Sequence, residues 1–333
     1  MRILLVGDVM LGRLVNQHLK TEPPEYPWGD TLSIFRDCDV RLCNLECVLS
    51  DRGRPWSATP KMFHFRSDAK NVVVLKAAAI NAVSNANNHA LDYEYDAMFE
   101  MFALLDKSQI GHAGAGPNRA EACRPAVIES NQLRVGMLAC TDNEPAWEAT
   151  CNHPGICYTP MDTKDPRAQE LMAVITNIRE NLDFLVVSAH WGGNWGYRPP
   201  DEHVLFGRAL IDAGADVVFG HSAHVFRGIE IYREKPILYN TGDFIDDYAV
   251  DEIERNDESF VFVVTASGHD VREISLYPTL ICSFRAQRAE PRAALQIASK
   301  MQALCRELHA DAQWSRSENC LKIDVHRSVR HVA

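Results

Sequence analysis

The sequence predicts an α/β fold in which helices pack against a parallel or mixed β-sheet. Short apolar runs alternate with longer amphipathic stretches over the first two thirds of the chain, and this alternation is typical of strand–helix units. The chain has 333 residues, of which 46% are hydrophobic and 24% are charged. It is therefore long enough to bury a large core, and its composition excludes disordered and fibrous classes.

Six strands are expected in the alternating part, because each is a short run of mostly aliphatic side chains. These runs are Ile3–Val6, Val40–Cys43, Ile80–Ser84, Val135–Ala139, Phe184–Ser188 and Val217–Phe219. The amphipathic stretches between them predict helices at Ala69–Ala79, Tyr95–Lys107, Ala168–Glu180 and Glu202–Ala213. The segment 141–166 is rich in Asn, Pro and Trp, and we expect it to form a long loop of the kind that often carries function.

The pattern changes after residue 225, where strand-like pieces follow one another. They are Gly228–Tyr232, Pro236–Tyr239, Phe260–Thr265 and Val271–Tyr277. A last helix is predicted over Arg292–Leu308, followed by a polar tail. Because no Gly-, Ser- or Pro-rich linker interrupts the chain, we expect one domain over residues 1–280, with a C-terminal helical extension over 281–333 packed on it.

The charge balance excludes a general nucleic-acid binder. Lys and Arg number 34 and Asp and Glu number 45, so the net charge is −11, whereas nucleic-acid affinity depends on an excess of cations facing phosphate. An acidic protein that binds a small anion therefore needs a specific local binding site for it.

The chain start and the cysteines give two further expectations. The apolar run that begins at Met1 meets an acid at Asp8, which is too early for a signal peptide, and no stretch approaches the about 18 apolar residues of a membrane helix. We therefore expect a cytoplasmic protein without a transmembrane segment. The ten cysteines include no C-x-x-C pair, so reduced and mostly buried thiols are predicted.

Polar residues follow five of the predicted strands. Ligands of open α/β sheets bind at the carboxyl ends of strands, and the side chains found there are Asp8, Asn44, Glu46, Asn87, Asn88, His89, His190, His221 and His224. Taken one at a time, each of these residues also has a purely structural interpretation. Asp8 fits a helix cap, Asn44 and Glu46 fit turn positions, and 87–89 fits the start of a helix. Together they predict a metal or acid–base site, because Asp, Glu, Asn and His are the ligands of borderline divalent metals.

In these motifs the sequence resembles the bacterial CapA family of poly-γ-glutamate capsule biosynthesis proteins, a branch of the calcineurin-like metallophosphoesterases. The likeness runs from about Met1 to Asp246. The motifs that carry it are Gly7-Asp-Val-Met-Leu-Gly-Arg13, Asn44-Leu-Glu46, Asn87-Asn-His-Ala-Leu-Asp92, His190-Trp-Gly192 and Gly220-His-x-x-His224. The resemblance implies a four-layer α/β/β/α sandwich with a metal centre at one edge, holding one or two divalent ions (Mn, Zn or Fe).

The resemblance also implies roles for individual residues. Asp8 and His224 would ligate a first metal, Asn88, His190 and His221 would ligate a second, and Glu46 would bridge the two. His89 matches the general acid beside the leaving group, and Asp92 and His190 join it as catalytic candidates. The candidate substrate contacts are Arg13, Lys61, His64, Arg66, Trp191, Arg198 and Asp243.

Two departures from the related motifs concern the predicted site. Met10 stands where metallophosphoesterases usually have a ligand His, so the first metal loses a ligand. Asp243 stands where the CapA family commonly has Asn, and this adds a carboxylate near the site. Whether the site holds one ion or two therefore stays open at this stage.

Three functions fit these motifs. The first is a metal-dependent hydrolase of a phosphoester or of a glutamyl-type peptide amide, with a small anionic or peptide substrate. The second is a peptide epimerase, in which His89 or His190 moves a Cα proton. The third is a non-catalytic protein that binds capsule polymer, although such a protein does not need this set of acids and histidines. The oligomeric state stays open.

Overall fold

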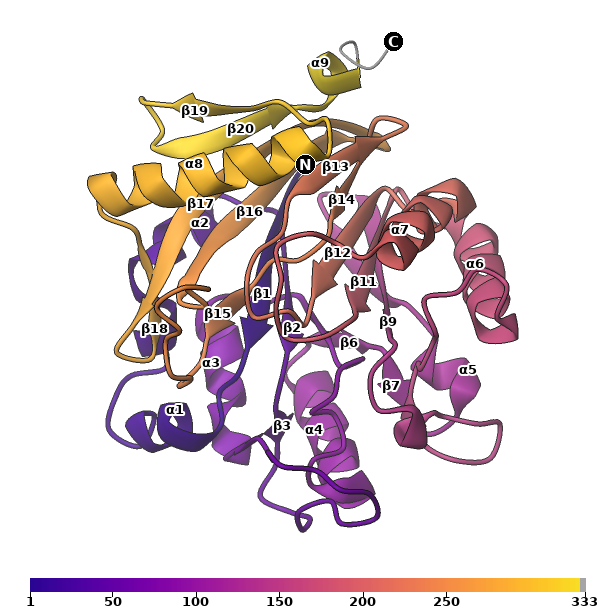
Figure 1. Cartoon of the computed structure of the whole chain (residues 1–333). Coiled ribbons are helices and arrows are strands. Elements are labelled where there is room, and N and C mark those ends of the chain that lie inside the picture. Colours follow the sequence, from indigo (N-terminus) through magenta and orange to yellow (C-terminus); the bar gives the residue numbers. More distant parts are fainter. Residues whose placement is uncertain (330–333) are drawn as a thin grey trace.

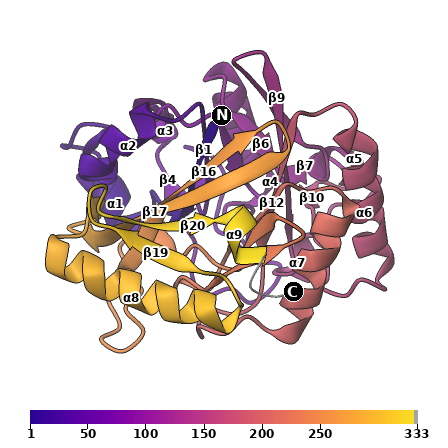
Figure 2. The same cartoon turned by 90° about the horizontal axis from the view of Figure 1, so that it is seen from above.

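The computed structural model describes residues 1–329, and it consists of two mixed β-sheets packed face to face with helices on both outer faces (Figure 1). Seen from above, α1–α3 lie on one side of the strands and α5–α7 on the other (Figure 2). The four-layer α/β/β/α sandwich expected from the resemblance is thus confirmed.

The larger sheet has ten strands in the order β19-β20-β17-β16-β1-β2-β5-β6, with β15 paired to β1 and β18 paired to β17. Its strands are β1 (Arg2–Val9), β2 (Val40–Leu45), β5 (Ala82–Ser84), β6 (Gly111–Ala113), β15 (Asp243–Ile245), β16 (Glu258–Ser267), β17 (Asp270–Cys282), β18 (Arg285–Arg288), β19 (Ala312–Ser315) and β20 (Cys320–Asp324). Strands β1, β2, β5 and β6 are mutually parallel, so their carboxyl ends share one edge.

The smaller sheet has six strands in the order β13-β14-β12-β11-β9-β8. They are β8 (Ala126–Ser130), β9 (Leu133–Thr141), β11 (Phe184–His190), β12 (Val217–His221), β13 (Ile229–Tyr232) and β14 (Lys235–Leu238). Two short pairs stand apart from both sheets, β3 (Val48–Leu49) with β4 (Arg66–Ser67) and β7 (Ala115–Gly116) with β10 (Gly155–Ile156).

The helices cover the outer faces and one end of the molecule. They are α1 (Arg13–His18), α2 (Leu32–Arg36), α3 (Val72–Ala77), α4 (Glu94–Lys107), α5 (Arg119–Ala122), α6 (Pro166–Arg179), α7 (Asp201–Ala213), α8 (Pro291–Glu307) and α9 (Val325–Val329), with 3₁₀ turns at Tyr26–Thr31, Ala69–Asn71 and Pro145–Trp147. Helix α8 and the hairpin β19–β20 lie at the end opposite α4 (Figure 1). No helix within residues 1–329 is long and apolar enough to cross a bilayer.

Both faces of the central strands are buried, and this explains their continuous apolar runs. In β1, Leu4 packs among the residues under α2–α4, whereas Ile3 faces the other sheet. In β11, Phe184 packs into the same inter-sheet core as Ile3, whereas Leu185 packs under α6 and α7. Successive side chains of a strand point to opposite faces, so each run supplies two cores.

The strand ends that carry the polar motifs are divided between the two facing sheets, with β1, β2 and β5 in one and β11 and β12 in the other. The structure corrects two expectations about the chain. The segment 281–333 contains β19 and β20 as well as helices, since Leu321 and Ile323 alternate into the inter-sheet core. The loop 141–166 includes the short strand β10.

A disulfide joins Cys123 to Cys157, so the prediction that all cysteines are reduced is wrong for this pair. Cys123 follows α5 and Cys157 follows β10, and the pairing of Gly116 with Gly155 brings these two segments together. The other eight cysteines of the described part of the chain are free, and six of them are buried.

Candidate metal centre

The ends of β1 and β15 meet at the centre of the site. Asp8 pairs in parallel register with Asp243, and the amide of Asp8 donates to the carbonyl of Gly242 at 3.1 Å. A Cβ atom at Gly7 would lie 1.8 Å from that carbonyl oxygen. Only glycine at position 7 therefore lets two strands that are distant in sequence place their carboxylates side by side.

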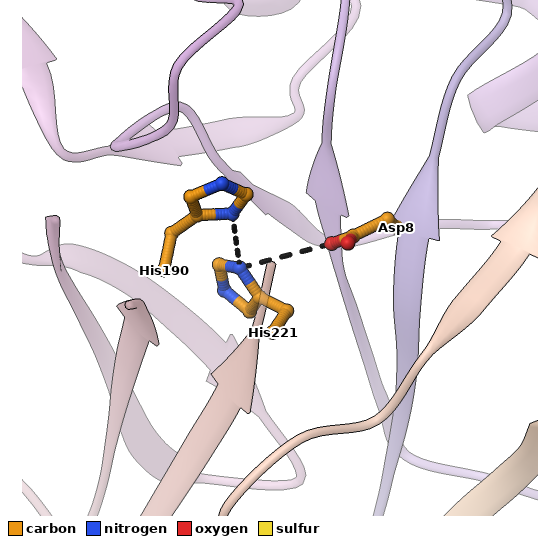
Figure 3. A group of neighbouring side chains, drawn as sticks. All are labelled: Asp8, His190 and His221. Carbon is orange, nitrogen blue, oxygen red and sulfur yellow. Dashed lines mark hydrogen bonds and ion pairs between the residues drawn. The ribbon is translucent and has the colours of Figure 1, made fainter. Parts of the chain in front are cut away.

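Asp8, His190 and His221 form the His-rich position, in which one ligand atom of each residue lies within 4.8 Å of the others (Figure 3). The Nδ1 atoms of the two imidazoles face each other at 2.9 Å. His221 Nδ1 lies 3.7 Å from Asp8 Oδ1, and its Nε2 bonds the Ser188 hydroxyl at 2.6 Å. Two ring nitrogens at this separation need a shared proton or a cation between them.

Asp8, His224 and Asp243 form the acid-rich position, again with ligand atoms within 4.8 Å of one another. His224 Nδ1 lies 2.9 Å from Asp243 Oδ1. Met10 is fully buried, and its sulfur accepts a hydrogen bond from the Gly12 amide. Its thioether therefore packs locally and supplies no nitrogen in place of the His found in metallophosphoesterases.

Several buried carboxylates surround these positions with part of their hydrogen-bonding capacity unused. Glu46 Oε2, Asp243 Oδ2 and Asp246 Oδ2 are buried without a partner. Burial and the nearby Asp8 raise the pKa of Glu46 and of Asp243 well above their ordinary values. Burial and Asp243 do the same to the pKa of Asp246. Clustered buried carboxylates of this kind are stabilised by a cation.

The histidines are held in the neutral form that binds metals. Burial, and then the neighbouring His221, lower the pKa of His190 well below its ordinary value. Burial lowers the pKa of His221 to about 3. Burial also lowers the pKa of His224, and the charge of Asp8 opposes this shift.

Three asparagines connect the strand ends. Asn44 Nδ2 donates to Asp8 Oδ1 at 2.8 Å, and Asn44 Oδ1 accepts from Asn87 at 2.9 Å. Asn88 Oδ1 lies 3.0 Å from His190 Nε2. The side-chain amides of Asn44 on β2 and of the segment after β5 therefore orient Asp8 in the larger sheet and His190 in the smaller one.

His89 stands beside this cluster in a fixed orientation. Its Nδ1 bonds Asp92 Oδ2 at 2.6 Å, and its ring stacks on Phe65 with centroids 3.9 Å apart. Its Nε2 points toward Glu46, 3.9 Å from Oε1. Burial lowers the pKa of His89, while the charge and hydrogen bond of Asp92 oppose the shift. Asp92 thus fixes the tautomer and leaves Nε2 free to exchange a proton.

The cluster opens into a cavity of about 370 Å³. Polar lining comes from Glu46, Asn88, His89, Ser222 and His224, and the lining aromatic and apolar side chains are Met62, Phe63, Phe65, Trp195 and Tyr248. Met62, Phe63 and Trp195 are 85%, 55% and 48% exposed. The cavity therefore has a polar floor and an apolar mouth.

Of the predicted substrate contacts, Arg13 and Lys61 line this cavity. Both are already paired with acids: Arg13 lies 3.3 Å from Asp247, and Lys61 lies 3.4 Å from Asp92 and 3.1 Å from Glu144. Their charges are therefore largely balanced within the protein.

The structure does not place four other predicted contacts at the cavity. Trp191 is a fully buried core side chain that donates to the Tyr239 carbonyl. Arg198 is exposed and lines a different hollow. His64 bonds the Trp56 carbonyl, and Arg66 lies over the Tyr93 ring. Asp243, the seventh, lies in the acid-rich position.

Some residues of the site were not assigned a role from the sequence. Asn44 lies in a recognised motif, and the acid-rich run 243–247 is the signal for Asp246. Glu144 lies in the segment 141–166, which the sequence predicts to be a long functional loop. Phe65 and Tyr248 were assigned no role, because loops that are distant in sequence bring them to the cavity.

Comparisons with known proteins agree with this picture. The family model described as bacterial capsule synthesis protein PGA_cap matches residues 2–248. A Mycobacterium tuberculosis protein named probable polyglutamine synthesis accessory protein is 32% identical, with 86% of each chain covered. The PGA biosynthesis protein CapA of Bacillus subtilis is 29% identical over 73% of this chain and 62% of its own length.

One solved structure has a similar fold, and the similarity supports the fold and nothing further. A hypothetical protein from Thermus thermophilus superposes with a TM-score of 0.50 at 15% identity, covering 84% of this chain and 98% of that one. The family match spans every motif from Asp8 to Asp243 and thus both donor positions. The chain belongs to the bacterial capsule synthesis protein PGA_cap family.

Proposed function

We propose that this protein is a metal-dependent hydrolase that cleaves a phosphoester or a glutamyl-type amide. The observation that carries the proposal is that Asp8 belongs to both the His-rich and the acid-rich position, directly beside the His89–Asp92 pair. A structural site needs neither the pair nor an opening to a cavity.

The residues present fit a divalent metal. Glu46 and Asp243 each keep one buried oxygen without a partner, and the facing nitrogens of His190 and His221 lie 2.9 Å apart, where either a shared proton or a cation satisfies both. Asp8, His224 and Glu46 would hold a first ion, and Asp8, Glu46, Asn88, His190 and His221 would hold a second. Mn, Zn and Fe suit these nitrogen and oxygen donors. When bound, such ions supply Lewis acidity and lower the pKa of water.

The balance of charge makes substrate binding depend on the metal. Around the cavity floor, the four acids Asp8, Glu46, Asp92 and Asp243 outnumber the two cations that line the cavity, Arg13 and Lys61. An anionic substrate is repelled by this floor until bound cations reverse its sign.

The chain's own residues supply the proton and the orientation. His89 Nε2 faces the cluster, and the Asp92 carboxylate accepts from Nδ1 and stabilises the protonated ring. The imidazolium form of His89 can therefore donate its Nε2 proton to the leaving group, which leaves a neutral ring whose Nδ1 proton stays on the bond to Asp92. Asn88 and Asn44 hold their partners in place. Phe65 excludes water from one face of the imidazole.

The apolar mouth indicates a substrate that joins an anionic head to an apolar or aromatic part. Met62 and Phe63 are too exposed to serve the core, and each contributes contact area at the cavity rim. We expect the double variant Met62→Ser/Phe63→Ser to raise the KM for an aryl phosphate several-fold with kcat unchanged, whereas Phe99→Ser on α4 leaves KM unchanged.

The first experiment is metal analysis of the purified protein together with hydrolysis assays. An aryl phosphate and a γ-glutamyl anilide are tested with Mn²⁺, Zn²⁺ or Fe²⁺. We expect one substrate class to be cleaved, with kcat reduced about 10²–10⁴-fold in His89→Ala and unchanged in His153→Ala, an exposed histidine. Absence of bound metal, together with no turnover of either substrate, would contradict the proposal.

The two alternatives from the sequence gain no support. The named relatives refer to capsule and polyglutamine synthesis, and none points to a peptide epimerase. A polymer-binding module has no use for buried carboxylates without partners.

A further inference from the structure

The acid-rich position lacks the histidine that metallophosphoesterases usually have two residues after the first aspartate. Met10 fills the sequence position of that ligand, but its sulfur accepts a hydrogen bond from the Gly12 amide at 3.1 Å within a buried turn. Asp8, His224 and the shared Glu46 then leave this position one donor short of the related sites. A further donor is therefore needed here to complete the set.

Asp243 approaches from the opposite side through the pairing of β15 with β1. The Asp8–Asp243 register and the absence of a Cβ at Gly7 bring the two carboxylates to the same level of the sheet edge. The ligand atoms of Asp8, His224 and Asp243 lie within 4.8 Å of one another, which is the spacing of donors around a single ion.

The two oxygens of Asp243 have different surroundings. Oδ1 lies 2.9 Å from His224 Nδ1, while Oδ2 has no partner although the side chain is fully buried. A carboxylate that served only to orient the imidazole would leave Oδ2 desolvated without compensation. A cation at the centre of the three residues accounts for this oxygen.

We propose that Asp243 replaces the missing histidine as a ligand of the first metal, so that the acid-rich position prefers Mn²⁺ while the His-rich position prefers Zn²⁺. This inference rests on the proposed metal-dependent function. Two carboxylates and one imidazole form a harder donor set, and Asp8 with His190 and His221 forms a more nitrogen-rich one. Carboxylates suit Mn²⁺, and imidazoles suit Zn²⁺.

The test uses the metal-free protein with Mn²⁺ and Zn²⁺ as probes. Bound Mn²⁺ is followed by the loss of the free-ion electron paramagnetic resonance signal, and both metals are counted by elemental analysis. We expect one Mn²⁺ and one Zn²⁺ per chain for the wild type. Asp243→Asn should weaken Mn²⁺ binding at least 100-fold and keep the zinc, and His221→Gln should do the reverse.

Two controls separate ligation from structure. The amide oxygen introduced by Asp243→Asn can still accept a hydrogen bond from His224, so an orienting role would survive this change. The metal-free variant should unfold at the same or a higher temperature than the wild type, because one buried carboxylate is removed. Asp246→Asn removes a neighbouring buried acid outside both donor groups and should leave Mn²⁺ binding within tenfold.

The possible failures are distinguishable. A weakening by Asp243→Asn of less than 100-fold, or an equal weakening by Asp246→Asn, would overturn the role of Asp243 and leave the metal site itself standing. A wild type that binds neither metal would overturn both this inference and the proposed function.

Discussion

Gly7→Ala is the sharpest single perturbation of this site, because it acts where β1 meets β15. The new Cβ would lie 1.8 Å from the Gly242 carbonyl oxygen, whereas ordinary contacts begin at 3.4 Å. One strand must therefore move by about 1.6 Å, and the bond from the Asp8 amide to Gly242 is lost. Overpacking of this kind and the lost hydrogen bond together cost about 3 kcal/mol.

The expected shift in melting temperature follows from chain length. At about 2.1 cal/mol/K per residue, the unfolding entropy of 333 residues is about 0.7 kcal/mol/K. A loss of about 3 kcal/mol therefore lowers the Tm by about 4 °C, measured by calorimetry on the metal-free protein. Movement of β15 also shifts Asp243, so metal affinity at the acid-rich position should fall as well.

Gly193→Ala is the matched control. Gly193 lies in the loop after β11, and a Cβ there meets nothing within 4 Å, so its Tm should stay within about 1 °C of the wild type or rise slightly. If Gly7→Ala also kept its Tm and its Mn²⁺ affinity unchanged, the close approach of the two strands would not be what positions Asp243.

Three further outcomes are expected. Asp92→Asn removes the carboxylate that holds His89, so steady-state kinetics should show kcat about 10²-fold lower with little change in KM. An unchanged kcat would exclude a role for Asp92 in orienting His89. Cys123→Ser removes a disulfide between residues 34 apart and should lower the free energy of unfolding by about 3–4 kcal/mol. The Tm of the variant should be about 5 °C below that of the wild type without reductant, and equal to it when reductant is present. Burial, and then Arg227, lower the pKa of His203 to about 4, so as pH falls below about 6.5 the unfolded chain binds this proton before the folded chain does. The free energy of unfolding should therefore be about 2 kcal/mol lower at about pH 5 than at about pH 7 because of this group. Urea denaturation of His203→Gln should show a correspondingly smaller loss between the two pH values.

The sequence predicted the strands of the core and most polar residues of the site for a clear physical reason. Aliphatic runs such as Ile3–Val6 end in a polar residue at the sheet edge, and Asp8 and His190 follow directly from that rule.

The division into two sheets could not be predicted in the same way. Ile3 and Leu4 are both buried, one between the sheets and one under helices, so no polar alternation marks the inner face. Trp191 follows His190 directly, but it points to the other face of the sheet and packs in the core under α6 and α7. The pairing of Asp8 with Asp243 spans most of the chain and has no local signal.

The spread of the donor residues along the chain sets an order of events during biosynthesis. Asp8 is made before the other donors, and Asp243 follows 235 residues later. At about 5–20 residues per second, roughly ten to fifty seconds separate their appearance. The acid-rich position cannot exist before then, so any metal bound there must arrive after residue 243 has been made.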